Sequence, residues 1–243
     1  MKKGLGEKIR ALFAKGGYTC DGCGLEIFEY PQKRLCEECE RALVRVEKHV
    51  CPKCGRRSIA EGVCLTCKRK MPEFTVGISP FVYEGLSASL VNRFKNGERY
   101  LRDFFAEEMM KTLRERLKES EIENMIVTFV PASEEKRQKR GYDQAEELAI
   151  VVAEQMGLEL DGEILVKTRE TGEQKLLTAK ERAENLKGSF RVHKRTLVNG
   201  RSVLLIDDIM TTGSTGNECA RVLKNAGASK VVFLTATSVP IRK

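Results

Sequence analysis

The sequence predicts an α/β fold with a mainly parallel sheet and helices on both faces, preceded by a small cysteine-rich module. Three observations carry this prediction. Strand-like and helix-like segments alternate after residue 72, which is typical of a parallel sheet. The apolar strand at 202–208 has the composition of a strand buried on both faces. Eight of the nine cysteines lie before residue 68, which marks off the N-terminal module.

Alternating elements account for the chain after Met71-Pro72, where the cysteine pairs end. In chain order we expect a strand pair (74–85), helices (90–117), a strand (125–131), a helix (142–156), a short strand near 164–166, a polar stretch (168–185), a strand (202–208), a helix (216–227) and a strand (230–237). We therefore expect three parts, namely an N-terminal amphipathic helix (1–18), a double zinc ribbon (19–72) and an α/β domain (73–243).

The first 18 residues are basic and carry one apolar stripe. Leu5, Ile9, Leu12 and Phe13 recur at helical spacing, which predicts an amphipathic helix over 1–18. A helix docked on its own protein and a helix on a membrane surface both fit this pattern. The segment has no continuous apolar core, and no apolar run in the chain reaches the roughly 18 residues of a membrane span. We expect a cytoplasmic protein without a membrane span.

Eight cysteines form four C-x-x-C pairs, separated by 12, 11 and 9 residues. The pairs are Cys20/Cys23, Cys36/Cys39, Cys51/Cys54 and Cys64/Cys67. Two such pairs supply the four soft ligands of a tetrahedral zinc site, and a closed four-cysteine site is structural. We expect two structural zinc sites. Pairing in sequence order needs only local hairpins, so it is favoured over an interleaved arrangement.

Three other uses of the cysteines are disulfides, redox dithiols and an iron–sulfur cluster. Disulfides need an oxidising compartment, and the chain shows no export signal. A redox dithiol usually occurs as one C-x-x-C beside a βαβ unit, not as four in a row. An iron–sulfur cluster remains a minor alternative to zinc.

Most of the formal net charge of +8 lies in residues 1–72, which hold 16 Lys and Arg against 9 Asp and Glu. Eight zinc-bound thiolates with two Zn²⁺ would remove about four of these charges. Arg56–Arg57 and Lys68–Lys70 could track phosphates, so nucleic-acid binding is permitted. The charge alone does not predict it.

Residues 203–215 combine an apolar strand, two adjacent carboxylates and a hydroxyl-rich loop. Asp207 and Asp208 stand at the carboxyl end of the strand, where ligands bind in open α/β sheets. Vicinal ribose hydroxyls, with Mg²⁺ nearby, would engage such like charges. The loop then runs into a helix N-terminus, whose amides and dipole suit a phosphate. Its residues are Thr211, Thr212, Gly213, Ser214 and Thr215.

This stretch lacks the spacing of a Walker A loop and resembles the PRPP signature of type I phosphoribosyltransferases. The resemblance implies that fold for the α/β domain, with PRPP and Mg²⁺ bound together. Asp207 and Asp208 would then hold the ribose hydroxyls, and 211–215 the 5′-phosphate.

A receptor for the pyrophosphate arm is expected at another strand end, where amides and cations suit such an anion. The candidates are Ala132, Ser133, Arg137 and Arg140. The polar residues of 168–190 have the composition of a mobile lid, although a plain surface loop fits equally. The lid candidates are Arg169, Gln174, Lys175 and Arg182.

Several segments together resemble the ComF-type competence proteins. They are the cysteine module and residues 90–100, 136–149, 174–190 and 203–228. The resemblance implies a role in natural transformation, with PRPP, single-stranded DNA and a DNA-uptake helicase as partners. One position departs from the family pattern, because Asp143 stands where relatives usually carry Asn after an Arg-Gly-aromatic triplet.

Three functions are compatible with these features. The chain could be a PRPP-binding protein of DNA uptake, a transferase moving ribose 5-phosphate to an unidentified base or amine, or a PRPP sensor acting through protein partners. Thr211 stands where purine-salvage relatives often carry an acid. Core packing explains Phe74, Phe81 and Tyr83 as well as a base platform does. With no tryptophan and 6% aromatic residues, contacts with DNA would be mainly electrostatic.

Overall fold

The computed structural model describes residues 19–28, 33–169 and 185–241. Its main sheet has six strands, every pair of them parallel, in the order β1-β8-β7-β3-β4 with β2 also beside β8. The strands are β1 (Val76–Ile78), β2 (Phe81–Val82), β3 (Met125–Phe129), β4 (Glu159–Leu160), β7 (Ser202–Met210) and β8 (Lys230–Ser238). The expected parallel α/β architecture is confirmed.

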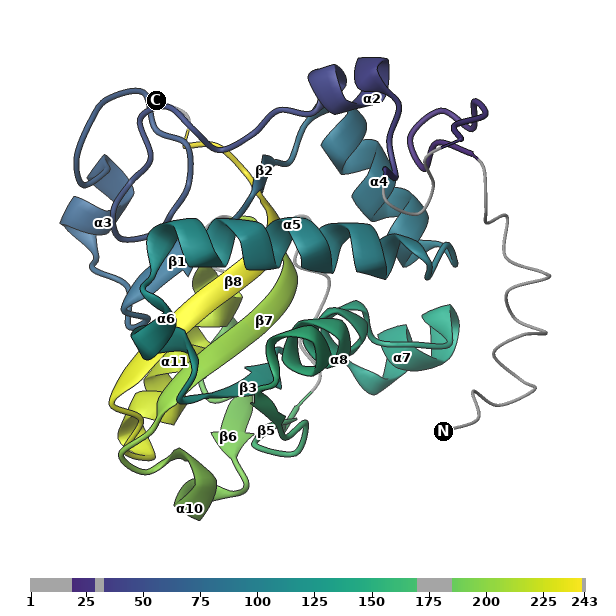
Figure 1. Cartoon of the computed structure of the whole chain (residues 1–243). Helices are drawn as coiled ribbons and strands as arrows, with labels where there is room; N and C mark the ends of the chain where they lie inside the picture. The colour runs from purple at the N-terminus through teal and green to yellow at the C-terminus, as the bar shows by residue number, and fades with distance from the viewer. Residues whose placement is uncertain (1–18, 29–32, 170–184, 242–243) are drawn as a thin grey trace.

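Helices cover both faces of this sheet (Figure 1). On one face lie α5 (Leu101–Arg116) and α8 (Gln144–Met156), and on the other lies α11 (Ser214–Asn225). Leu204 and Ile206 of β7 belong to the apolar core on the α5 and α8 side, whereas Val203 and Leu205 belong to the core on the α11 side. Residues 203–206 of this central strand are all apolar because both of its faces are covered.

The remaining elements are shorter. They are α2 (Glu37–Ala42), α3 (Leu65–Arg69), α4 (Gly85–Lys95), α6 (Glu119–Ile122), α7 (Glu134–Arg140), α10 (Arg195–Val198), β5 (Leu165–Lys167) and β6 (Phe190–Val192). The strands expected at 74–85 are present, but each pairs with β8 instead of with the other. The strand expected near 164–166 lies outside the main sheet, because β5 pairs antiparallel with β6.

A glycine sets the distance between α11 and the sheet. A Cβ at Gly216 would lie 2.3 Å from the ring of Phe233 on β8, so no larger residue fits there without moving the helix. The start of α11 therefore packs directly on β8. The loop 211–215, which runs from the end of β7 into the first turn of α11, lies at the same edge as Asp207 and Asp208.

The cysteine-rich part contacts the α/β part beside β2. Val46 N donates to the Pro80 carbonyl at 2.9 Å, and Val82 N donates to the Val44 carbonyl at 2.8 Å. Because Phe81 of β2 pairs with Thr237 near the end of β8, this contact lies at the carboxyl edge of the sheet. The helix expected over 1–18 lies outside the described residues. Among the described helices, none has the length and apolar character needed to cross a membrane.

Candidate functional site

Asp207 and Asp208 lie side by side near the carboxyl end of β7, a central strand of the sheet. The backbone N–H of Asp208 donates to Asp207 Oδ1 at 2.8 Å. The Asp208 carboxylate forms an ion pair with Lys95 Nζ at 3.0 Å. Both acids are partly exposed, so a ligand can reach a pair of which one member already has a cationic partner.

The two acids differ in their electrostatic surroundings. Protein atoms crowding the Asp207 carboxyl raise its pKa well above 3.8, and the neighbouring Asp208 carboxylate raises it further. The N–H of Asp208 and the charge of Lys95 oppose the rise without cancelling it. A ligand that offers hydroxyl donors or a divalent cation would favour the ionised form of Asp207.

Lys95 is a site residue that sequence reasoning did not single out. It is the last residue of α4, and the Tyr142 hydroxyl donates to the carbonyl of the preceding Phe94. Tyr142 also accepts from the N–H of Gly97 at 3.3 Å, so one buried phenol holds the C-terminus of α4. The segment 90–100 contributed to the family resemblance, but a lysine at a helix end is common and its partner lies far away in sequence.

Further cations gather around Asp208. Protein atoms around the Lys136 side chain lower its pKa, and the nearby charges of Lys167, Arg140 and Lys95 lower it further, while Asp208 opposes them. These basic residues come from α4, α7 and β5, elements that are separate in sequence. The acidic pair is therefore flanked by a positive region, which suits a ligand carrying several negative charges.

The loop 211–215 has the form of an anion cradle. Gly213 adopts the left-handed conformation with φ +81°, which turns the chain into α11. Thr212 Oγ1 accepts from the N–H of Ser214 at 3.3 Å, and the two hydroxyls lie 2.8 Å apart. The first turn of α11 contains no acidic residue. The positive end of the helix dipole therefore faces the loop with no carboxylate in that first turn to offset it.

The residues expected to receive a pyrophosphate have intramolecular partners. The Ala132 N–H donates to Asp143 Oδ2 at 2.7 Å, and Ser133 caps α7 by accepting from Lys136 N at 3.4 Å. Arg137 pairs with Glu146, and Arg140 donates to the side chain of Gln144. Each of the four candidates therefore already has a hydrogen-bond or ion-pair partner within the protein.

The hydrogen bonds of Asp143 account for an aspartate at this position, where relatives usually carry asparagine. Its Oδ1 caps α8 by accepting from Ala145 N at 3.0 Å, while its Oδ2 accepts from Ala132. The two N–H donors bond different carboxylate oxygens, whereas asparagine has an NH₂ group in place of one of them. Burial raises the pKa of Asp143, although the N–H groups of Ala132 and Ala145 lower it in part.

Asp143→Ala is expected to lower the free energy of unfolding by about 2 kcal/mol, because α8 loses its cap and a buried N–H loses its acceptor. Asp143→Asn is expected to cost roughly half as much, since its single oxygen can still cap α8. Urea denaturation measures both values. Glu146→Ala, which removes a more exposed carboxylate from the first turn of the same helix, is the control. Equal losses in the Ala and Asn variants would contradict the role of Ala132.

Of the four lid candidates, the structure describes Arg169. Its guanidinium donates to the carbonyls of Asn185 at 2.7 Å and Lys187 at 3.1 Å, and to Ser189 Oγ at 3.2 Å. Arg169 thus ties together the two chain ends that flank 170–184. Gln174, Lys175 and Arg182 lie outside the described residues.

The cysteines form two tetrads in sequence order, as expected. The sulfur atoms of Cys20, Cys23, Cys36 and Cys39 lie within 4.8 Å of one another, and so do those of Cys51, Cys54, Cys64 and Cys67. Burial raises the pKa of Cys20 and of Cys51, but backbone N–H donors outweigh it and set both at about 7. Each tetrad could hold a metal ion, and a set of four thiolates with N–H···S hydrogen bonds fits a soft cation.

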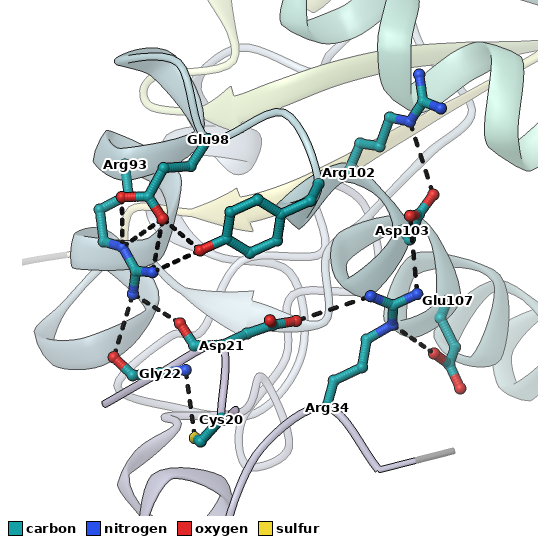
Figure 2. A network of polar contacts seen from close by, with 10 residues as sticks. Cys20, Asp21, Gly22, Arg34, Arg93, Glu98, Arg102, Asp103 and Glu107 are labelled. Atoms are coloured by element: carbon teal, nitrogen blue, oxygen red, sulfur yellow. Dashed lines mark hydrogen bonds and ion pairs between the residues drawn. The ribbon is translucent and has the colours of Figure 1, made fainter. Parts of the chain in front are cut away.

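The first tetrad is fixed to α4 and α5 by an arginine network (Figure 2). Arg93 donates to the carbonyls of Asp21 at 2.6 Å and Gly22 at 3.1 Å. Arg34 lies 3.7 Å from the carboxylates of both Asp21 and Asp103. Burial raises the pKa of Asp21 to about 6 against these two arginines. The first knuckle is therefore held by its backbone, while Cys23 is exposed.

The second tetrad is part of the apolar core next to loop 211–215. All four of its cysteines are buried, and they pack in one apolar cluster with Phe74, Met210 and Phe233. The Gly77 N–H of β1 donates to the Lys53 carbonyl at 2.8 Å. The second tetrad thus shares its packing with the strand that leads into loop 211–215.

Comparisons with known proteins agree with this arrangement. Residues 138–243 match the family model described as phosphoribosyl transferase domain, a range that includes Asp207, Asp208 and the loop but not Ala132 or Ser133. The chain is 29% identical over 204 residues to DNA utilization protein YhgH of Escherichia coli (strain K12), covering 81% of this chain and 87% of the relative.

Two further relatives reach 30% identity. One is DNA utilization protein YhgH of Salmonella typhimurium, over 203 residues that cover 81% of this chain and 87% of the relative. The other is competence protein ComFC of Streptococcus pneumoniae, over 202 residues that cover 81% and 84%. The similarity therefore covers about four fifths of this chain and more than four fifths of each relative.

Proposed function

The chain belongs to the family of competence protein ComFC and DNA utilization protein YhgH, and from this premise we propose that it is a cytoplasmic PRPP-binding protein of DNA uptake. The observation that carries the proposal is the acidic pair Asp207–Asp208 beside the anion cradle 211–215. Hydroxyl acceptors and a phosphate cradle at one sheet edge match a ribose that carries a 5′-phosphate.

Each part of PRPP has a matching group in this proposal. Asp207 and Asp208 accept from the ribose hydroxyls, and the N-terminal amides of α11 with the loop hydroxyls bind the 5′-phosphate. Lys95 and Lys136 face the pyrophosphate arm as cations. Mg²⁺, when bound with PRPP, neutralises part of the pyrophosphate charge, and carboxylate oxygens suit it.

Single-stranded DNA and a DNA-uptake helicase are the proposed macromolecular partners. The names of the relatives, competence and DNA utilization, support this part of the proposal. Lys68, Arg69 and Lys70 are exposed at the end of α3 and could track a phosphate backbone. Arg56 was an expected phosphate contact too, but it is only 7% exposed and so is unsuited to DNA.

Phosphorus NMR tests the PRPP part directly. PRPP and Mg²⁺ are mixed with the protein and with a pool of bases and single-stranded DNA. Shifted or broadened PRPP lines without turnover support the binding function. Release of pyrophosphate with consumption of an acceptor would show a transferase instead, although Phe74 and Phe81 are buried and offer no base platform. Unchanged lines would refute PRPP binding.

A titration of labelled single strands tests the DNA part. Binding is expected to weaken steeply as salt rises, because phosphate contacts release counterions. The absence of binding at low salt would count against single-stranded DNA as a partner. Chains altered at Lys68, Arg69 and Lys70 together are the matched comparison.

We further propose that both cysteine tetrads hold zinc as structural sites. The expected content is two zinc ions per chain, one for each tetrad, measured by elemental analysis after purification under reducing conditions. A chelator is expected to remove metal first from the tetrad that contains the exposed Cys23. Iron in place of zinc, or no metal at all, would contradict this assignment.

A further inference from the structure

The second cysteine tetrad reaches the phosphate loop through one side chain. We propose that Arg56 positions loop 211–215, so that the metal-bound knuckle 51–56 sets how tightly the loop binds a phosphate group. This inference rests on the proposed PRPP function, because it assigns regulation of that site to the second tetrad. It gives the cysteine-rich part a role in ligand binding beyond structural support.

The contact is direct and partly buried. Arg56 Nη1 donates to the carbonyl oxygen of Thr211 at 2.8 Å, although the two residues are 155 positions apart in the chain. Arg56 is 7% exposed, whereas Thr211, the first residue of the loop, is exposed. A buried guanidinium that hydrogen-bonds a loop carbonyl restrains the loop more strongly than a neutral donor would.

The knuckle that carries Arg56 is seated against the sheet with no room to shift. A Cβ at Gly55 would lie 1.9 Å from the carbonyl oxygen of Gly77, and a Cβ at Gly77 would lie 2.4 Å from that of Cys54. Such close backbone contact is possible only between two glycines. Arg56 follows Gly55 directly, so its position depends on the knuckle's own geometry.

The start of the loop is also held by the C-terminal segment. The carbonyl of Met210, the residue before Thr211, accepts from Val239 N at 2.9 Å, and Ile241 N donates to the Arg57 carbonyl at 2.9 Å. The C-terminal segment thus links the loop's first turn to the same knuckle. Inside the loop the hydroxyls of Thr212 and Ser214 bind each other, so the restraint on Thr211 comes from outside.

Arg56 also lies close to the metal ligands. The Cys51 N–H donates to the Arg56 carbonyl at 3.1 Å, and Arg56 follows Cys54 by two positions. One residue therefore contacts a ligand of the second tetrad through its backbone and loop 211–215 through its guanidinium. Loss of metal from this tetrad would release the knuckle and, with it, the hydrogen bond to Thr211.

The test compares Arg56→Met and Arg56→Lys with Arg57→Met. Arg57 is the matched control, because it is the adjacent arginine but pairs with Glu84 at 3.5 Å. PRPP affinity with Mg²⁺ is measured by calorimetry, zinc by elemental analysis, and amide hydrogen exchange is followed at 212–215. Arg56→Met is expected to weaken PRPP binding about tenfold to a hundredfold and to speed exchange in the loop. The PRPP affinity and loop exchange of Arg56→Lys are expected to lie between those of Arg56→Met and the unaltered protein, and those of Arg57→Met to match the unaltered protein.

Unchanged affinity and unchanged loop exchange in Arg56→Met would overturn the proposal. If Arg56→Met loses zinc, Arg56→Lys decides: weaker binding at full zinc content supports the positioning role, and unaltered binding overturns it. If the unaltered protein does not bind PRPP, the proposed function fails, yet loop exchange in the Arg56 variants still tests whether Arg56 positions 211–215.

Discussion

The double variant Asp207→Asn with Asp208→Asn is expected to lower PRPP affinity about a hundredfold or more while leaving the zinc content unchanged. A hydrogen bond to a charged acceptor contributes roughly 1.5–3 kcal/mol, and each carboxylate would lose one or more of them to the ribose hydroxyls. Calorimetry with Mg²⁺ measures the affinity. Retained affinity in a folded double variant would show that the ribose does not bind at these acids.

The free energy of unfolding provides the control for this variant. The pKa of Asp207 determines whether the substitution raises or lowers that free energy. Burial and the Asp208 charge raise the pKa of Asp207 above 3.8. Its favourable contribution is therefore full below that ordinary value and is lost as pH rises through the folded-state pKa. Asparagine cannot ionise, and its oxygen can still accept from the Asp208 N–H. Asp207→Asn is thus expected to be at least as stable as the unaltered protein at neutral pH.

Urea unfolding at a series of pH values checks this expectation. The unaltered protein should lose free energy of unfolding relative to Asp207→Asn as pH rises above 3.8. Parallel pH profiles would mean that Asp207 carries no unfavourable charge in the unliganded site. A stable variant that no longer binds PRPP would separate the ligand role of the acids from any role in folding.

Contiguous motifs made much of the fold and site predictable. Asp207, Asp208 and the loop 211–215 follow one another in a single strand–loop–helix unit, so their proximity needs no knowledge of long-range packing. Each C-x-x-C pair is likewise a local turn, and sequential pairing joins neighbouring turns. Strand and helix periods then place these units in a parallel α/β sheet.

Contacts between distant segments were not predictable in the same way. Lys95 meets Asp208, and Arg56 meets Thr211, because α4 and the second knuckle pack against the carboxyl edge of the sheet. Composition made Arg56 look like a surface cation, and only its burial reveals the contact with the loop. From the sequence, the backbone N–H of Ala132 was expected to be available to bind pyrophosphate, whereas in the structure it donates a hydrogen bond to Asp143.

The two tetrads differ in how closely they pack with the core of the α/β part. We therefore expect the loss of a cysteine from each to lower the free energy of unfolding by very different amounts. Cys67 is 3% exposed and lies in the core cluster with Phe74 and Met210, while Cys23 is exposed. Removing either ligand should disrupt one zinc site. Both tetrads contain buried thiols, but the knuckle 51–56 that contacts Gly77 and Thr211 belongs to the second, and losing that site would release it.

Cys67→Ser is therefore expected to lower the free energy of unfolding by roughly 4 kcal/mol or more, the range typical of losing a structural metal. Cys23→Ser is expected to cost less than about half of that, because Arg93 still holds the backbone of the first knuckle. Denaturation curves and zinc analysis of the two variants measure the contrast. PRPP affinity should fall in Cys67→Ser and stay near its original value in Cys23→Ser. Equal losses of stability and affinity in both variants would mean that the two metal sites support the protein alike, with no particular link between the second tetrad and the phosphate loop.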